Sequence, residues 1–140
     1  MKKYTFLDHT ADAKFQAFGN TLEEAFQNAA LATAFLMWDW KKINKKITRK
    51  VEVKGNDIKQ LLCSFLEEII YLLDSEMFLL SSVENLRIKK RENRYYLEAL
   101  FEGDNSSDKY KIYGDVKAIT YNEMEIKENV PVILQVVVDV

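Results

Sequence analysis

The chain has 140 residues, of which 48% are hydrophobic and 30% charged, and its formal net charge is −2. This length suits a single compact domain over residues 1–140, and the near-zero charge excludes a global basic field for nucleic acid. With only four glycines and one proline, the sequence also excludes long flexible linkers.

The location of the protein is constrained by cysteine usage and hydropathy. The single cysteine, Cys63, cannot form an internal disulfide, and no Cys/His cluster suggests zinc. The start of the chain is charged and strand-like rather than a long apolar signal segment. The longest apolar run, residues 69–73, is much shorter than a membrane span. We therefore expect a cytoplasmic protein with no membrane partner.

The first third of the chain predicts a strand followed by a helix. Residues 14–19 alternate between polar and apolar side chains, which predicts a strand with Phe15 on one face. The sequence Thr-Leu-Glu-Glu that begins at Thr21 is a capping box, in which Glu24 reaches back to the start of the helix. Apolar residues then recur at three- and four-residue spacings as far as Met37, so one face of this helix is expected to be buried.

The middle of the chain predicts a lysine-rich strand and a second helix. Residues 41–54 combine lysines with β-branched residues, which favours a strand with a solvated lysine face. Asp57 follows a turn and is a suitable N-cap for a helix from about residue 58 to residue 73. Cys63 lies on the apolar face of that helix and is expected to be a small core residue.

The last third of the chain is rich in strand signals, interrupted by a polar turn at residues 102–108. The expected strands cover Val83 to Lys90, Arg94 to Phe101, Lys109 to Tyr121, Met124 to Lys127 and Val132 to Val138. Strands that follow helices in this order indicate an α+β fold, with mixed, mainly antiparallel sheets packed against two amphipathic helices.

Two acids at opposite ends of the chain could form a cation site. Asp12 ends the run Leu-Asp-His-Thr-Ala-Asp, and Asp139 stands next to the terminal carboxylate of Val140. Each acid alone has an ordinary interpretation, as a turn residue or as the polar end of a strand. If the fold brings them together, their oxygens suit a hard cation: calcium, or magnesium or manganese in stricter octahedral geometry.

Other candidate residues have a structural interpretation beside the functional one. Lys117 is either a solvent-facing strand lysine or a cation placed beside the acids or a phosphate. His9 is the only histidine, and a hydrogen-bonded structural role is the ordinary expectation. Trp38 and Trp40 are expected to pack in the core. The lysines near residues 41–50 are expected to form a solvated face, or to meet an acidic partner or RNA.

The chain resembles the archease family in four blocks: residues 7–26, residues 61–71, Val-Lys-Ala-Ile-Thr-Tyr at 116–121 and Val-Val-Val-Asp-Val at the end. The resemblance implies an accessory protein that activates an RtcB-type RNA ligase. This ligase seals tRNA halves after it guanylylates its own histidine with GTP and manganese. The protein would meet tRNA only indirectly, through the ligase, and would not itself be an enzyme.

The resemblance also implies roles for particular residues. Asp12, Asp139 and Val140 match the family's metal site, for which calcium is expected, and Lys117 matches a lysine needed for ligase activation. Asp8 and His9 are expected to support the site. Asn122 departs from the family pattern, since many relatives have histidine there. Two alternatives stay open: a metal-dependent phosphoesterase using the same acids, and a general RNA-binding or chaperone module using the lysines and tryptophans.

Overall fold

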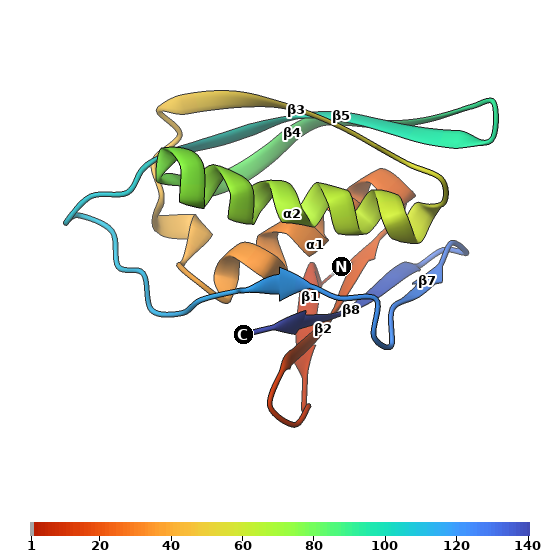
Figure 1. Cartoon of the computed structure of the whole chain (residues 1–140), viewed down its shortest axis with the longest axis horizontal. Coiled ribbons are helices and arrows are strands. Elements are labelled where there is room, and N and C mark those ends of the chain that lie inside the picture. The colour runs from red at the N-terminus through yellow and green to blue at the C-terminus, as the bar shows by residue number, and fades with distance from the viewer. Residues whose placement is uncertain (1) are drawn as a thin grey trace.

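The structure is a computed structural model that describes residues 2–140. Two helices lie between two antiparallel sheets, so the molecule has three layers (Figure 1). The helices are α1 (Leu22–Phe35) and α2 (Ile58–Glu76), and a short 3-10 helix, η1 (Trp40–Lys42), follows α1. All strand pairings are antiparallel within the part of the chain that the structure describes, which confirms the predicted α+β class.

The first sheet joins the two ends of the chain. Its strands are β1 (Tyr4–Leu7), β2 (Ala13–Gly19), β6 (Ala118–Ile119), β7 (Glu125–Lys127) and β8 (Val132–Asp139). They run in the order β1-β2-β8, and β6 and β7 both pair with the other edge of β8. Phe15 and its partner Val136 are fully buried, because this face of the sheet packs on the helices. Side chains of alternate residues of β2, such as Lys14 and Gln16, therefore belong to the outer face.

The second sheet covers the opposite side of the helices and has the order β3-β5-β4. Its strands are β3 (Ile47–Gly55), β4 (Phe78–Arg91) and β5 (Arg94–Asn105). Leu97, Ala99 and Phe101 on β5 are buried against the helix layer. The intervening residues face solvent, so this sheet has one apolar and one polar face, as is common for antiparallel sheets.

Local capping signals in the sequence begin both helices where they were expected. The backbone N–H of Glu24 donates to Thr21 Oγ1 at 3.1 Å, and Glu24 Oε1 accepts from the backbone N–H of Asn20 at 2.8 Å. Asp57 caps α2 by accepting from the backbone N–H of Gln60 at 2.8 Å. The helix runs three residues beyond the expected end at residue 73, because it stops only at Met77, in the left-handed conformation.

Two predictions about the last third of the chain are wrong in detail. Only Ala118–Ile119 forms a strand within the expected strand of residues 109–121. The preceding residues follow the surface beside the end of α1, where the backbone N–H of Tyr113 donates to the carbonyl of Met37 at 2.9 Å. The expected turn at residues 102–108 is shortened, because β5 continues as far as Asn105, where Phe78 of β4 pairs with it.

Cys63 and Trp38 lie in the core as predicted, whereas Trp40 packs only at its edge. Cys63 and Trp38 are buried in the core, and Trp38 Nε1 donates to the carbonyl of Leu80 at 2.9 Å. Trp40 is half-buried, and its Nε1 donates to the hydroxyl of Tyr4 at 3.0 Å. Neither helix within residues 2–140 combines the length and apolar character that crossing a membrane requires.

Candidate functional site

The sheet brings the two candidate acids to one place. Ala13 at the start of β2 pairs with Val138 near the end of β8. Asp12 precedes Ala13 and Asp139 follows Val138, so the two acids stand directly beyond the last pair of this antiparallel ladder. Paired residues of such a ladder have their Cβ atoms about 4.5–5.5 Å apart on the same face of the sheet, and the two acids are the next residues along from its last pair. We refer to Asp12 and Asp139 as the acid pair.

The third candidate residue, Lys117, directly precedes β6 at the same end of the sheet. Ala118 pairs with Asp139, and the backbone N–H of Lys117 donates to the carbonyl of Asp139 at 2.7 Å. Val140 follows Asp139 directly and is exposed. Segments that lie more than 100 residues apart in the sequence thus meet around β8, which is the central strand of the site.

The acid pair is accessible and lacks internal counterions. Asp12 is half-buried and Asp139 is exposed. Neither carboxylate has a basic nitrogen within 4 Å among residues 2–140. The same residues contain no group of three or more His, Cys, Asp or Glu side chains placed to hold a metal. Two free carboxylates fit a hard cation that would keep much of its coordination for water or a partner.

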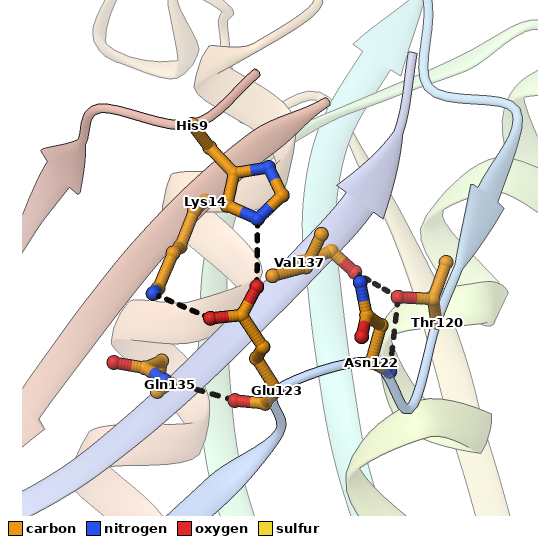
Figure 2. Close-up of polar contacts among 7 residues, drawn as sticks. All are labelled: His9, Lys14, Thr120, Asn122, Glu123, Gln135 and Val137. Carbon is orange, nitrogen blue, oxygen red and sulfur yellow. Dashed lines mark hydrogen bonds and ion pairs between the residues drawn. The ribbon is translucent and has the colours of Figure 1, made fainter. Parts of the chain in front are cut away.

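A second group of charged residues lies one step along the strands from the acid pair, and Figure 2 shows the contacts within it. The carboxylate of Glu123 contacts His9 Nε2 at 2.7 Å with one oxygen and accepts from Lys14 Nζ at 3.1 Å with the other. His9 comes from the β1–β2 loop, Lys14 from β2 and Glu123 from the turn between β6 and β7. We refer to these three residues as the Glu123 cluster.

The Glu123 side chain reaches across β8, because its backbone lies beside one edge of that strand and its carboxylate contacts β2 on the other. Gln135 of β8 donates from Nε2 to the backbone carbonyl of Glu123 at 2.9 Å, and it accepts from Gln16 of β2 at 3.0 Å. The cluster therefore ties the β1–β2 loop, which carries Asp12, to the turn that follows β6.

Charge compensation is complete at Glu123. The hydrogen bond with His9, followed by the one from Lys14, lowers the pKa of the Glu123 carboxyl below its ordinary value of 4.5. Glu123 adopts a positive φ of 52°, which is uncommon for a residue other than glycine. His9 Nδ1 is buried and has no hydrogen-bond partner within the described residues. The three side chains form a structural contact rather than an open binding site.

Sequence reasoning named Asp12, Asp139 and Lys117, which the structure brings to one end of the sheet, but it did not single out Lys14, Glu123 or Gln135. It expected His9 to be hydrogen-bonded, and the contact with Glu123 confirms this. Asp8 is exposed on the loop, and its expected supporting role stays a prediction. The signal for Glu123 is not local, since its partners lie 114 and 109 residues away. Only the pairing of β2 with β8 brings them within reach.

Comparison with known proteins identifies similar chains over nearly the whole length. The model of the Archease protein family (MTH1598/TM1083) matches residues 4–140. A protein archease of Thermococcus kodakarensis is 41% identical over 129 residues, which cover 91% of this chain and 90% of the relative. A protein archease of Methanosarcina mazei is 35% identical over 128 residues, covering 91% and 88%.

Solved structures show the same architecture. The solution structure of Methanobacterium thermoautotrophicum protein 1598 superposes with a TM-score of 0.87 and 33% identity, and each chain is covered completely. An archease from Thermotoga maritima, described as a possible chaperone, gives a TM-score of 0.55 at 18% identity, covering 96% of this chain and 94% of its own. The second likeness concerns the fold alone.

Proposed function

The chain belongs to the archease family, and from that membership we propose that it activates an RtcB-type RNA ligase. In this proposal it promotes the GTP- and metal-dependent guanylylation of the ligase and so sustains multiple turnover during tRNA splicing. Its contact with tRNA in this activating role is indirect, through the ligase. The observation that carries the proposal is the meeting of Asp12, Asp139 and Lys117 at one end of the five-stranded sheet.

The surroundings of Cys63 and His9, the only cysteine and the only histidine, favour a non-enzymatic role. Burial raises the pKa of the Cys63 thiol, which leaves little of the reactive thiolate at neutral pH. The only histidine, His9, has its Nε2 engaged by Glu123. An activator needs neither group, because it can work by binding one conformation of its partner more tightly than another.

The acid pair supplies the features that such an activator needs. Two carboxylates without internal counterions create a negative site at an accessible end of the sheet, with the exposed Lys117 adjacent. Asp12 and Asp139, with the carboxylate of Val140, would hold a calcium ion, or manganese or magnesium. When bound, the cation would offset the repulsion between the acids. Its exposed coordination positions would be free for groups of the ligase.

The test is a ligation assay with the purified ligase and a large molar excess of RNA ends. We expect the wild-type protein to raise the number of products per ligase well above one. Asp12→Asn, Asp139→Asn and Lys117→Gln should each reduce this stimulation about tenfold or more, which corresponds to ~1.4 kcal/mol. Lack of stimulation by the wild type, or full stimulation by Asp12→Asn, would refute the proposal.

Matched controls come from the same sheet. Glu125 and Lys127 on β7 are exposed and lie away from the acid pair, so Glu125→Gln and Lys127→Gln remove the same charges. Both controls should stimulate the ligase like the wild type.

A separate assay distinguishes activation from the phosphoesterase alternative. The protein is incubated alone with a phosphate ester and calcium or manganese, since only an enzyme would release phosphate without the ligase.

A further inference from the structure

The outer face of the three-stranded sheet carries a group of basic residues around an exposed tyrosine. Tyr96 in the central strand β5 pairs with Lys54 of β3 on one side and with Lys89 of β4 on the other. Directly opposed residues in antiparallel strands share a face, so both lysines flank the tyrosine ring. The next outward-facing pair toward the β4–β5 hairpin is Arg91 with Arg94. We refer to these five residues as the Tyr96 face.

The positive charges of the Tyr96 face are largely uncompensated. Lys54, Lys89 and Arg91 have no carboxylate oxygen within 4 Å among residues 2–140. The nearest acids in the register are Glu52 and Glu98, one outward-facing row further along, and each has its own basic neighbour within 4.0 Å. A chain with a net charge of −2 therefore concentrates four cations at one end of one sheet.

The shape of this face suits a flat ligand. A hollow of about 390 Å³ lies over it, lined by Tyr96 and the cations Lys54, Arg87, Lys89 and Arg91, with Glu52 and Glu98 along the side away from the hairpin. The tyrosine is 38% exposed, although large aromatic side chains are usually well buried. Figure 1 shows the helices on the other side of this sheet. The face is thus held by a regular ladder, and a ligand would not have to order a loop in order to bind.

We propose that the Tyr96 face binds single-stranded RNA, with one base stacked on Tyr96 and the adjoining phosphates bound by the flanking cations. Exposed aromatic rings on a sheet surrounded by basic side chains are how many single-strand-binding folds combine stacking with phosphate contacts. A duplex keeps its base faces stacked inside and would use only the charges. The proposal goes beyond ligase activation, because it gives the protein its own contact with RNA on the sheet opposite to the acid pair.

The first test measures the fluorescence anisotropy of a labelled twelve-nucleotide oligouridylate with the full chain and no ligase. Lys54→Glu/Lys89→Glu should weaken binding about tenfold or more and should flatten the dependence of log K on log salt by roughly 0.7 for each phosphate that the protein no longer neutralises. Lys45→Glu/Lys46→Glu is the matched control, since both lysines are exposed and the net charge changes equally. This control should alter the affinity by less than about threefold.

A second set of variants tests the stacking contact. Tyr96→Leu should weaken binding about fivefold to tenfold, and Tyr96→Phe should retain it, because the ring and not the hydroxyl is needed. Lys54→Gln/Lys89→Gln, which removes charge without reversing it, should show a smaller loss in the same direction and guards against misfolding of the double glutamate variant. An RNA duplex of equal length should bind more weakly than the single strand.

Several results would overturn the proposal. These are equal losses in the two glutamate double variants, equal affinity of Tyr96→Leu and Tyr96→Phe, or binding of a polyglutamate peptide as tight as that of the oligouridylate. The last result would identify an acidic protein as the occupant. Because no ligase is present, a negative result leaves ligase activation untouched, and a failure of ligase activation leaves this result standing.

Discussion

Glu123 and the acid pair lie on the same side of the five-stranded sheet and differ in their surroundings. Glu123 contacts His9 and Lys14 at 2.7 and 3.1 Å, and its backbone carbonyl accepts from Gln135. Asp12 and Asp139 stand just beyond the end of the same ladder, and neither has a basic nitrogen within 4 Å among residues 2–140. One acid is thus neutralised within the fold, and the other two are left available.

This difference separates a role in folding from a role in binding. A carboxylate with hydrogen-bond and ion-pair partners stabilises the native state, so replacing it with an amide should be destabilising. Like charges that face each other across a ladder destabilise it, so neutralising one of them should be neutral or stabilising until a cation binds. The same chemical change, acid to amide, is expected to have opposite signs at the two places.

The largest effect should come from adding a metal. Calcium at about 100 times its dissociation constant would stabilise the native state by ~2.7 kcal/mol. For a domain of this size that corresponds to a rise of about 8 °C in the midpoint of thermal unfolding. Differential scanning calorimetry with calcium and then with a chelator measures the effect, and manganese and magnesium can be compared in the same way.

The acid pair is the specific part of that prediction. Asp12→Asn and Asp139→Asn should each abolish most of the calcium-induced rise, and Glu125→Gln, which removes an exposed acid of the same sheet, should keep it. A rise that persists unchanged in Asp12→Asn would show that calcium binds elsewhere on the protein.

The next effect in size is expected at Glu123. Glu123→Gln keeps the shape of the side chain but removes the charge that His9 and Lys14 contact, and it should lower the unfolding midpoint by about 3 °C at neutral pH. Thermal unfolding followed by circular dichroism measures the change. Glu125→Gln serves again as the control and should lie within about 1 °C of the wild type.

The pH dependence of that loss follows from the direction of the pKa shift. The folded-state pKa of Glu123 is lowered from 4.5, so the folded protein binds the proton less readily than the unfolded chain. The stabilisation is therefore fully present above the unfolded-state pKa and is lost as the pH falls through the folded-state pKa. The midpoints of the wild type and Glu123→Gln should converge as the pH is lowered below 4.5. A constant difference across this range would mean that the charge of Glu123 does not cause the loss.

Much of the fold follows from local patterns in the sequence. The alternation around Phe15 and the caps at Thr21 and Asp57 each depend on neighbours within a few residues, and the structure confirms each of them. The same alternation misleads at residues 109–117, which have strand-like residues but no ladder partner. Alternating polar and apolar residues indicate that a segment favours extended backbone. They do not indicate whether another strand lies beside that segment to pair with it.

The candidate site can be predicted from the sequence only for residues whose type and position in the chain indicate which other residues they will lie beside. Asp12 and Asp139 can be found because an acid at each end of the chain meets the other only if the end strands pair, and Ala13 does pair with Val138. Glu123 cannot be found in this way. It lies in a turn with several other polar residues, and its partners are fixed by the register of β2 on β8 together with the path of the turn after β6. Such a contact depends on the whole topology and leaves no mark in the nearby sequence.

The smallest effect is the most direct test of the comparison, because it concerns sign rather than size. In the presence of a chelator, Asp139→Asn should raise the unfolding midpoint by about 1 °C, since it removes repulsion with Asp12 and breaks no side-chain contact. Asp8→Asn is the control, because it removes an exposed acid from the β1–β2 loop that carries Asp12 but does not stand beside the end of β8, and it should leave the midpoint unchanged. If Asp139→Asn instead lowered the midpoint as Glu123→Gln does, the acid pair would have to be stabilised within the protein. Its carboxylates would then not be free for a cation, and this end of the sheet would not be a binding site.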